Sequence, residues 1–179
     1  MSIEWNKQSF QALKEVWQSG ESNPDLSDRE IALTARYEGI QCMVESDQIW
    51  PLTSSPARQK FNAAFREMLS RLPEEVFYQV DEIGFILEDP ALDYLAANVP
   101  APGSGDGGKL GIDTIVFFRA CLNFAPEAMI GLIAHEIAHS FVRGRDNRED
   151  EAFAEDKARE WGFGDELNCL ALAKEALPG

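Results

Sequence analysis

The chain has two histidines, and both lie in one short stretch, His135-Glu136-Ile137-Ala138-His139. Side chains four residues apart on a helix lie on the same face one turn apart, so both imidazoles can reach a single cation. Glu136 would lie beside the first histidine, where its carboxylate can accept a proton from a water on the same metal. The spacing therefore predicts a metal site, with zinc as the ion. The alternative is a pair of histidines that only pack or face solvent on an amphipathic helix.

A zinc site needs a third protein ligand, and no other histidine is available to provide it. The metzincin pattern is excluded, because Val142 and Arg145 occupy the positions of its glycine and of its third histidine. The ligand should then be a carboxylate or a thiolate. Glu151 and Glu155 follow the motif one helical turn apart, and both can face the histidines. At this point both glutamates remain candidates.

The segment that carries these glutamates is predicted to fold back against the motif helix. A short turn over residues 144–148 would make the two helices antiparallel. Ala154 and Ala158 share the stripe of the two glutamates, and such small side chains let two helix axes approach closely.

Residues 135–163 resemble the gluzincin branch of the zincin metallopeptidases, in which H-E-x-x-H and a turn precede E-x-x-A-D on a second helix. Small bacterial zinc metallopeptidases are similar down to the ending Trp161-Gly162-Phe163. The resemblance implies that Glu151 is the third ligand. It also implies that the residue at position 155 holds the first histidine by a hydrogen bond. Family members have Asp there and this chain has Glu155, whose longer side chain could orient His135 or bind the metal itself.

The same resemblance implies an activity, a cofactor and a substrate. The activity is peptide-bond hydrolysis by a Zn²⁺-activated water, with Glu136 as general base and a peptide or protein as substrate. In zincins the strand before the motif helix is a sheet edge along which the substrate lies. Residues 112–118 occupy that place, and Ile115, Val116 and Phe117 are the expected substrate contacts.

The hydrophobic pattern predicts an α+β fold, in which an edge strand of a small sheet packs on the motif helix in a minimal zincin-like arrangement. A helical region over 1–72 would precede a zincin-like core over 73–179, and the two would form one compact unit. The expected helices cover 3–18, 27–44, 57–72, 126–143, 146–162 and 165–176; the expected strands cover 76–87 and 112–118; a turn covers 50–56 and a loop 100–111.

Composition limits the partners. A net charge of -15, from 31 acidic and 16 basic residues, disfavours binding to nucleic acid. The longest apolar stretch, residues 128–134, is too short to span a membrane, and the N-terminus lacks a signal-peptide pattern. Cys42, Cys121 and Cys169 form no CxxC pair, so a disulfide framework is not expected. These features favour the cytoplasm.

Two weaker interpretations accompany the main one. Residues 103–109 contain G-x-G-x-x-G, but Leu110 replaces the Ser or Thr of a P-loop and a strand follows instead of a helix, so a connector or a lid is expected. A regulatory or interaction protein that keeps the zinc but cleaves weakly is the alternative function. A third possibility is an inactive zincin with structural zinc, which the retained Glu136 disfavours.

Overall fold

A computed structural model of the chain describes residues 36–41, 43–44, 49–51, 55–80, 83–88, 95–99, 113–141 and 147–177. The strands in these ranges are β1 (Ile49–Pro51), β2 (Ile83–Leu87), β3 (Ala96–Val99) and β4 (Asp113–Phe117). They form one sheet in the order β1-β2-β4-β3. β1, β2 and β4 are parallel, whereas β3 pairs antiparallel with β4 at one edge of the sheet.

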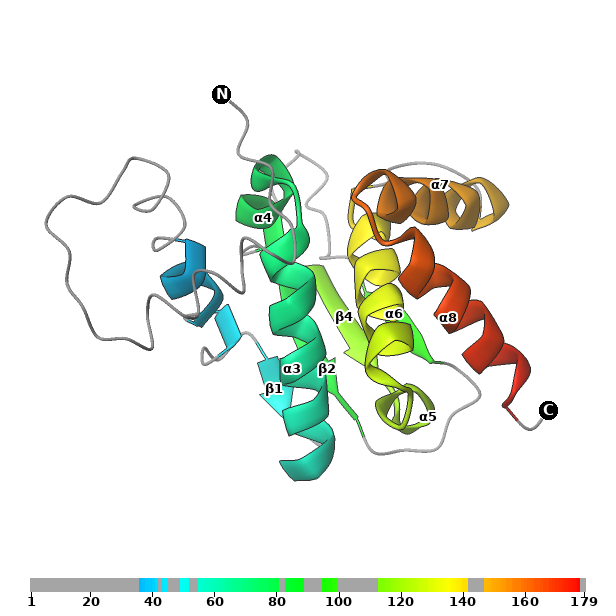
Figure 1. The fold of residues 1–179 in the computed structure, drawn as a ribbon, viewed down its shortest axis with the longest axis horizontal. Helices are drawn as coiled ribbons and strands as arrows, with labels where there is room; N and C mark the ends of the chain where they lie inside the picture. The colour runs from blue at the N-terminus through cyan, green and yellow to red at the C-terminus, as the bar shows by residue number, and fades with distance from the viewer. Residues whose placement is uncertain are drawn as a thin grey trace, which may run out of the picture.

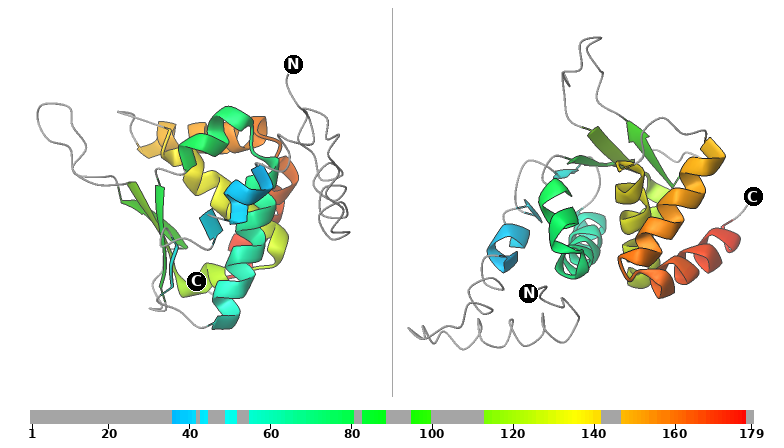
Figure 2. Two further views of the ribbon diagram at one scale, coloured as in Figure 1. Left: turned by 90° about the vertical axis from the view of Figure 1, so that its left-hand side faces the viewer. Right: turned by 90° about the horizontal axis from the view of Figure 1, so that it is seen from above.

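Helices cover one face of this sheet (Figure 2, right). Figure 1 shows α3 and α6 side by side over the strands, with α7 and α8 packed on the side of α6 that faces away from α3. Their bounds are α3 (Ser55–Arg71), α4 (Glu74–Val80), α5 (Arg119–Leu122), α6 (Pro126–His139), α7 (Asn147–Glu160) and α8 (Gly164–Glu175). Residues 36–41 and 43–44 are also helical. The mixture of elements agrees with the predicted α+β class.

The core lies between the helices and the sheet. Phe61 and Phe65 on α3 reach β4 and β2, with ring centroids 5.0 Å from Phe117 and 4.8 Å from Phe85. All four side chains are almost completely buried, and aromatic pairs at such distances contribute beyond the area that they bury. Since α3 and β1 come from the first 72 residues, elements on both sides of residue 72 share this core.

Two glycines set how the last helices meet α6. A Cβ placed on Gly131 of α6 would lie 2.4 Å from the backbone oxygen of Glu166, so only glycine lets α8 approach this closely. Gly162 has φ +90° and follows α7 directly, where a left-handed residue ends a helix at little cost. The sequence predicted the end of this helix correctly.

Several predicted elements are confirmed. Residues 57–72, 112–118, 146–162 and 165–176 match α3, β4, α7 and α8 within two residues at each end that the structure describes. The predicted helix over 126–143 ends earlier, at His139, where Ser140 donates its backbone N–H to Ile137 in a tighter turn. The end of the predicted helix over 27–44 is helical as well. The predicted helix over 3–18 and the loop over 100–111 lie outside the described residues.

Other predictions were wrong. The strand expected over 76–87 begins only at Ile83, because Val76, Phe77 and Val80 bury a helical face in α4. The turn expected over 50–56 is wrong at both ends, since Trp50 lies in β1 and α3 begins at Ser55. The edge strand β3 was not predicted.

The expected edge position of residues 112–118 is also wrong. β4 pairs with β2 on one side and with β3 on the other, so Ile115, Val116 and Phe117 already face main-chain partners on both strands. Ile115 and Phe117 also have fully buried side chains. The short strand β3 takes the outer position and covers β4. These three residues are therefore excluded as a substrate-binding edge.

Candidate metal centre

His135 and His139 lie in the last turns of α6, and their rings face the same space. Their Nε2 atoms are 3.2 Å apart, and the two rings are perpendicular with centroids at 4.7 Å. His135 is buried, with 7% of its surface exposed, whereas His139 is partly exposed. The four-residue spacing within one helix places both nitrogens at one point, as the sequence predicted.

Glu151 brings the third donor from the second turn of α7. Its Oε2 lies 3.2 Å from Nε2 of His135, and its Oε1 lies 3.4 Å from Nε2 of His139. The Glu151 side chain is 66% exposed, so this side of the cluster is open to solvent. The two histidines thus form the buried side of the centre and the glutamate forms its open side.

Close packing of α7 on α6 brings Glu151 within reach. Ala154 and Ala158 are fully buried on the side of α7 that meets the core. Beyond them, the ring of Trp161 packs edge-on against Phe141, with centroids 5.5 Å apart. Larger side chains at the two alanines would push the helix axes apart, so this small-residue contact fixes the distance between Glu151 and the histidines.

The separations fit a metal ion. Donors at about 2.0–2.1 Å from a tetrahedral zinc lie about 3.3 Å from one another. The two Nε2 atoms are 3.2 Å apart, and each lies 3.2–3.4 Å from a different carboxylate oxygen of Glu151. Within the described residues, His135, His139 and Glu151 form the group of His, Cys, Asp and Glu side chains that could hold a metal ion.

The protonation of His135 suits a ligand. Burial, together with the neighbouring His139, lowers the pKa of His135 to about 4, although Glu151 opposes this shift. The imidazole is therefore neutral at neutral pH, which is the form that binds metals. Two imidazoles and a carboxylate that face one another gain most when a cation lies between them.

Glu136 follows His135 directly and is partly buried. Burial, together with the nearby negative charge of Glu151, raises the pKa of its carboxyl to about 7. A carboxyl group with a pKa in this range can exchange a proton at neutral pH, which is what general acid–base chemistry requires.

The structure separates the two glutamates that the sequence left open. Glu151 joins the histidines, whereas Oε1 of Glu155 accepts a hydrogen bond from Arg159 at 2.7 Å. Glu155 is therefore not part of the cluster, and its carboxylate is occupied one turn along its own helix. An i, i+4 pair of this kind is visible in the sequence and could have been used to rank the two candidates.

The remaining feature that sequence reasoning missed is β3, which forms the sheet edge beside α6. Its four residues, Ala-Ala-Asn-Val, carry a weak strand signal.

Among the described residues, no helix has the length and apolarity needed to cross a bilayer. Comparisons of the chain with protein-family models, with curated proteins and with solved structures gave no match.

Proposed function

We propose that this chain is a zinc-dependent peptidase whose metal is held by His135, His139 and Glu151. The observation that carries the proposal is that the two histidine Nε2 atoms are 3.2 Å apart and that each lies within 3.4 Å of a carboxylate oxygen of Glu151. Zinc is the ion of choice because two imidazoles and one carboxylate with a free position are a donor set that catalytic zinc sites use.

The site contains the groups that hydrolysis of an amide needs. Zinc, when bound, acts as a Lewis acid toward a peptide carbonyl and toward a water molecule. Glu136 would take the proton of the attacking water and donate it to the leaving amine. The rings of His135 and His139 hold the more buried side of the centre, and the exposed side at Glu151 leaves room for a polypeptide to enter.

The proposed substrate is a peptide or protein segment in an extended conformation. β3 is the sheet edge beside α6, and among the described residues no strand pairs with its outer side. An extended peptide could add to this edge by main-chain hydrogen bonds. In this proposal β3 takes the role that the sequence assigned to residues 112–118.

A second function, a zinc-binding regulatory or interaction protein that cleaves weakly, is favoured by one observation. Glu155, at the position of the family's orienting Asp, bonds to Arg159 and is not part of the histidine cluster. An imidazole ligand without a carboxylate partner is a weaker and less well oriented ligand. Zinc would then bind without supporting efficient turnover.

Two measurements test the proposal. Metal analysis of the purified protein should give one zinc per chain, and the zinc should be lost from His139→Ala. Cleavage of a peptide library should then depend on zinc and on Glu136. Glu136→Gln keeps the shape of the side chain and all three ligands but cannot accept the proton, so it should bind zinc normally and fail to cleave. If the wild type is as inert as Glu136→Gln while both hold zinc, the peptidase function is refuted and the binding function stands.

A further inference from the structure

A cleft lies between α3 and the start of α6, away from the metal centre. Its volume is about 620 Å³, within the range of small-molecule sites in proteins. Part of its lining is apolar and comes from Ala64, Phe124, Met129 and Ile130. Three of these side chains are buried, and Phe124 is partly buried against the core. The cleft therefore offers an apolar surface on two helices that the sheet holds in place.

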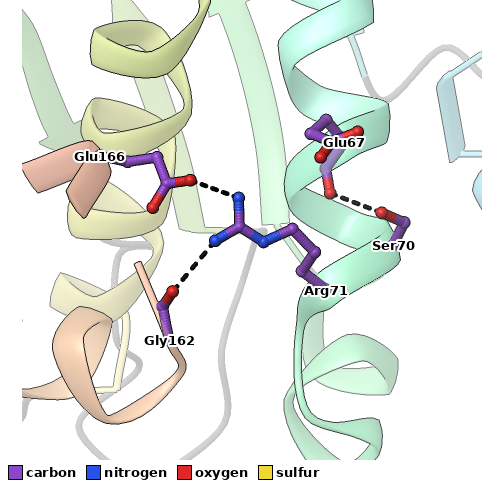
Figure 3. A network of polar contacts seen from close by, with 5 residues as sticks. All are labelled: Glu67, Ser70, Arg71, Gly162 and Glu166. Carbon is purple, nitrogen blue, oxygen red and sulfur yellow. Dashed lines mark hydrogen bonds and ion pairs between the residues drawn. The ribbon is translucent and has the colours of Figure 1, made fainter. Parts of the chain in front are cut away.

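One end of the cleft contains a pair of opposite charges that neutralise each other. Arg71 on α3 binds Glu166 on α8 at 2.5 Å and donates a second hydrogen bond to the backbone oxygen of Gly162 at 3.0 Å (Figure 3). The Arg71 side chain also lies over the ring of Phe163, 4.6 Å from its centroid. Because both terminal NH groups of Arg71 donate hydrogen bonds inside the protein, this side chain offers little charge to a ligand.

The other charged side chains of the lining are Lys60, Glu67 and Glu127. Ser70 donates to the backbone oxygen of Glu67 and leaves its carboxylate available (Figure 3). Within the described part of the chain, neither Glu67 nor Glu127 has a hydrogen bond or ion pair to its carboxylate. Two carboxylates against one lysine make this cleft negative, in a protein whose net charge is already -15.

We propose that this cleft is a second binding site, and that it takes a small molecule with an apolar body and a positively charged amino group. The apolar body would cover Met129 and Ile130, and the amino group would lie near Glu67 or Glu127. The positive end of the α6 dipole is nearby, but the negative charge of Glu127 in the first turn already compensates it. Binding of an anion is therefore disfavoured. None of the metal-binding side chains lines the cleft, so the site is independent of the proposed peptidase centre.

Three probes of similar size and different charge test the proposal: 2-phenylethylamine, 2-phenylethanol and 3-phenylpropionate. They are titrated into the full chain in the presence of EDTA, which prevents the amine from binding a metal. The methyl NMR signals of Met129, Ile130 and Ala64 are followed. The amine should shift these signals and should bind at least about fivefold more tightly than the carboxylate, with the alcohol between them. Added salt should weaken the amine selectively.

Matched variants locate the effect. Either Glu67→Gln or Glu127→Gln should weaken the amine about two- to fivefold and leave the alcohol unchanged, because only the charged probe loses an attraction. Glu75→Gln is the control, since Glu75 is also an exposed first-turn glutamate, on α4, but does not line the cleft. Ala63→Trp should block all the probes, because Ala63 is an exposed residue of the lining.

Three results would overturn the proposal: no shift of the lining methyl signals with the amine, equal affinity for amine and carboxylate, or an Ala63→Trp protein that is folded and still binds. The glutamine variants keep the test valid should Ala63→Trp fail to fold, because an unchanged affinity for the amine in both Glu67→Gln and Glu127→Gln also refutes the charge assignment.

Discussion

Replacing Glu151 with glutamine should remove most of the chain's affinity for zinc, whereas the same change at Glu155 should leave it nearly intact. The two residues lie one turn apart on α7, and their side chains are 66% and 52% exposed. They differ in the contacts that their carboxylates make. Glu151 lies 3.2 and 3.4 Å from the histidine nitrogens, and Glu155 bonds to Arg159 at 2.7 Å. Position on the helix and solvent exposure are therefore nearly matched.

The expected loss follows from the number of donors. Structural zinc sites with four ligands bind with about 10–16 kcal/mol, so one ligand contributes about 3–4 kcal/mol. At about 1.4 kcal/mol per factor of ten, the dissociation constant should rise on the order of 10²- to 10³-fold in Glu151→Gln. Glu155→Gln removes an exposed ion pair to Arg159, which is worth less than about 1 kcal/mol, and the pair is not part of the centre.

Competition between the metal-free protein and a chromophoric zinc chelator at neutral pH gives both dissociation constants, and metal analysis gives the stoichiometry. Circular dichroism checks that both variants are folded. A Glu151→Gln protein that binds zinc within about threefold of the wild type would refute the assignment of the third ligand. A large loss in Glu155→Gln alone would restore the alternative that the sequence left open.

Three further predictions concern a contact between helices, an ion pair and a buried thiol. Ala154→Leu should weaken zinc binding at least about tenfold by pushing α7 from α6, while Ala152→Leu on the exposed side should not, and the same chelator competition measures both. Arg71→Met should cost about 2 kcal/mol in urea unfolding because it removes the ion pair to the partly buried Glu166, and adding Glu166→Gln should recover part of this loss; an unchanged or larger loss in the double variant would contradict the pairing. Burial raises the pKa of Cys121 to about 12, so its stabilising effect is complete below about pH 9 and is lost as pH rises toward 12. Unfolding free energies from pH 8 to 11 should therefore fall more steeply in the wild type than in Cys121→Ala, and parallel curves would disprove this.

The sequence allowed the centre to be predicted because its geometry is mostly local. The spacing of His135 and His139 needs only the periodicity of one helix, and their reach to one point follows from it. The choice between Glu151 and Glu155 depended on more than spacing, since both lie on one stripe of α7. It is the contact of Glu155 with Arg159 that separates them.

The errors in the fold have tertiary causes. Val76, Phe77 and Val80 are residue types that favour strands, yet Pro73 accepts the backbone N–H groups of Val76 and Phe77 and starts a helix whose apolar face the core buries. β3 is four residues long and has little strand preference of its own. Its pairing with β4 stabilises it, and a partner distant in sequence leaves no local signal.

The two halves of the centre are not equally fixed. α6 is buried from Ala128 to His135 and again at Ile137 and Ala138, so its histidines sit on a helix that cannot shift without opening the core. Glu151 sits on a helix that meets the core through a few small residues and is mostly exposed itself. A change in the distance between the Glu151 carboxylate and the histidine nitrogens therefore requires a movement of α7. The packing of Ala154, Ala158 and Trp161 limits this movement. Metal affinity should thus depend more on how α7 is held against α6 than on α6, which carries two of the three ligands.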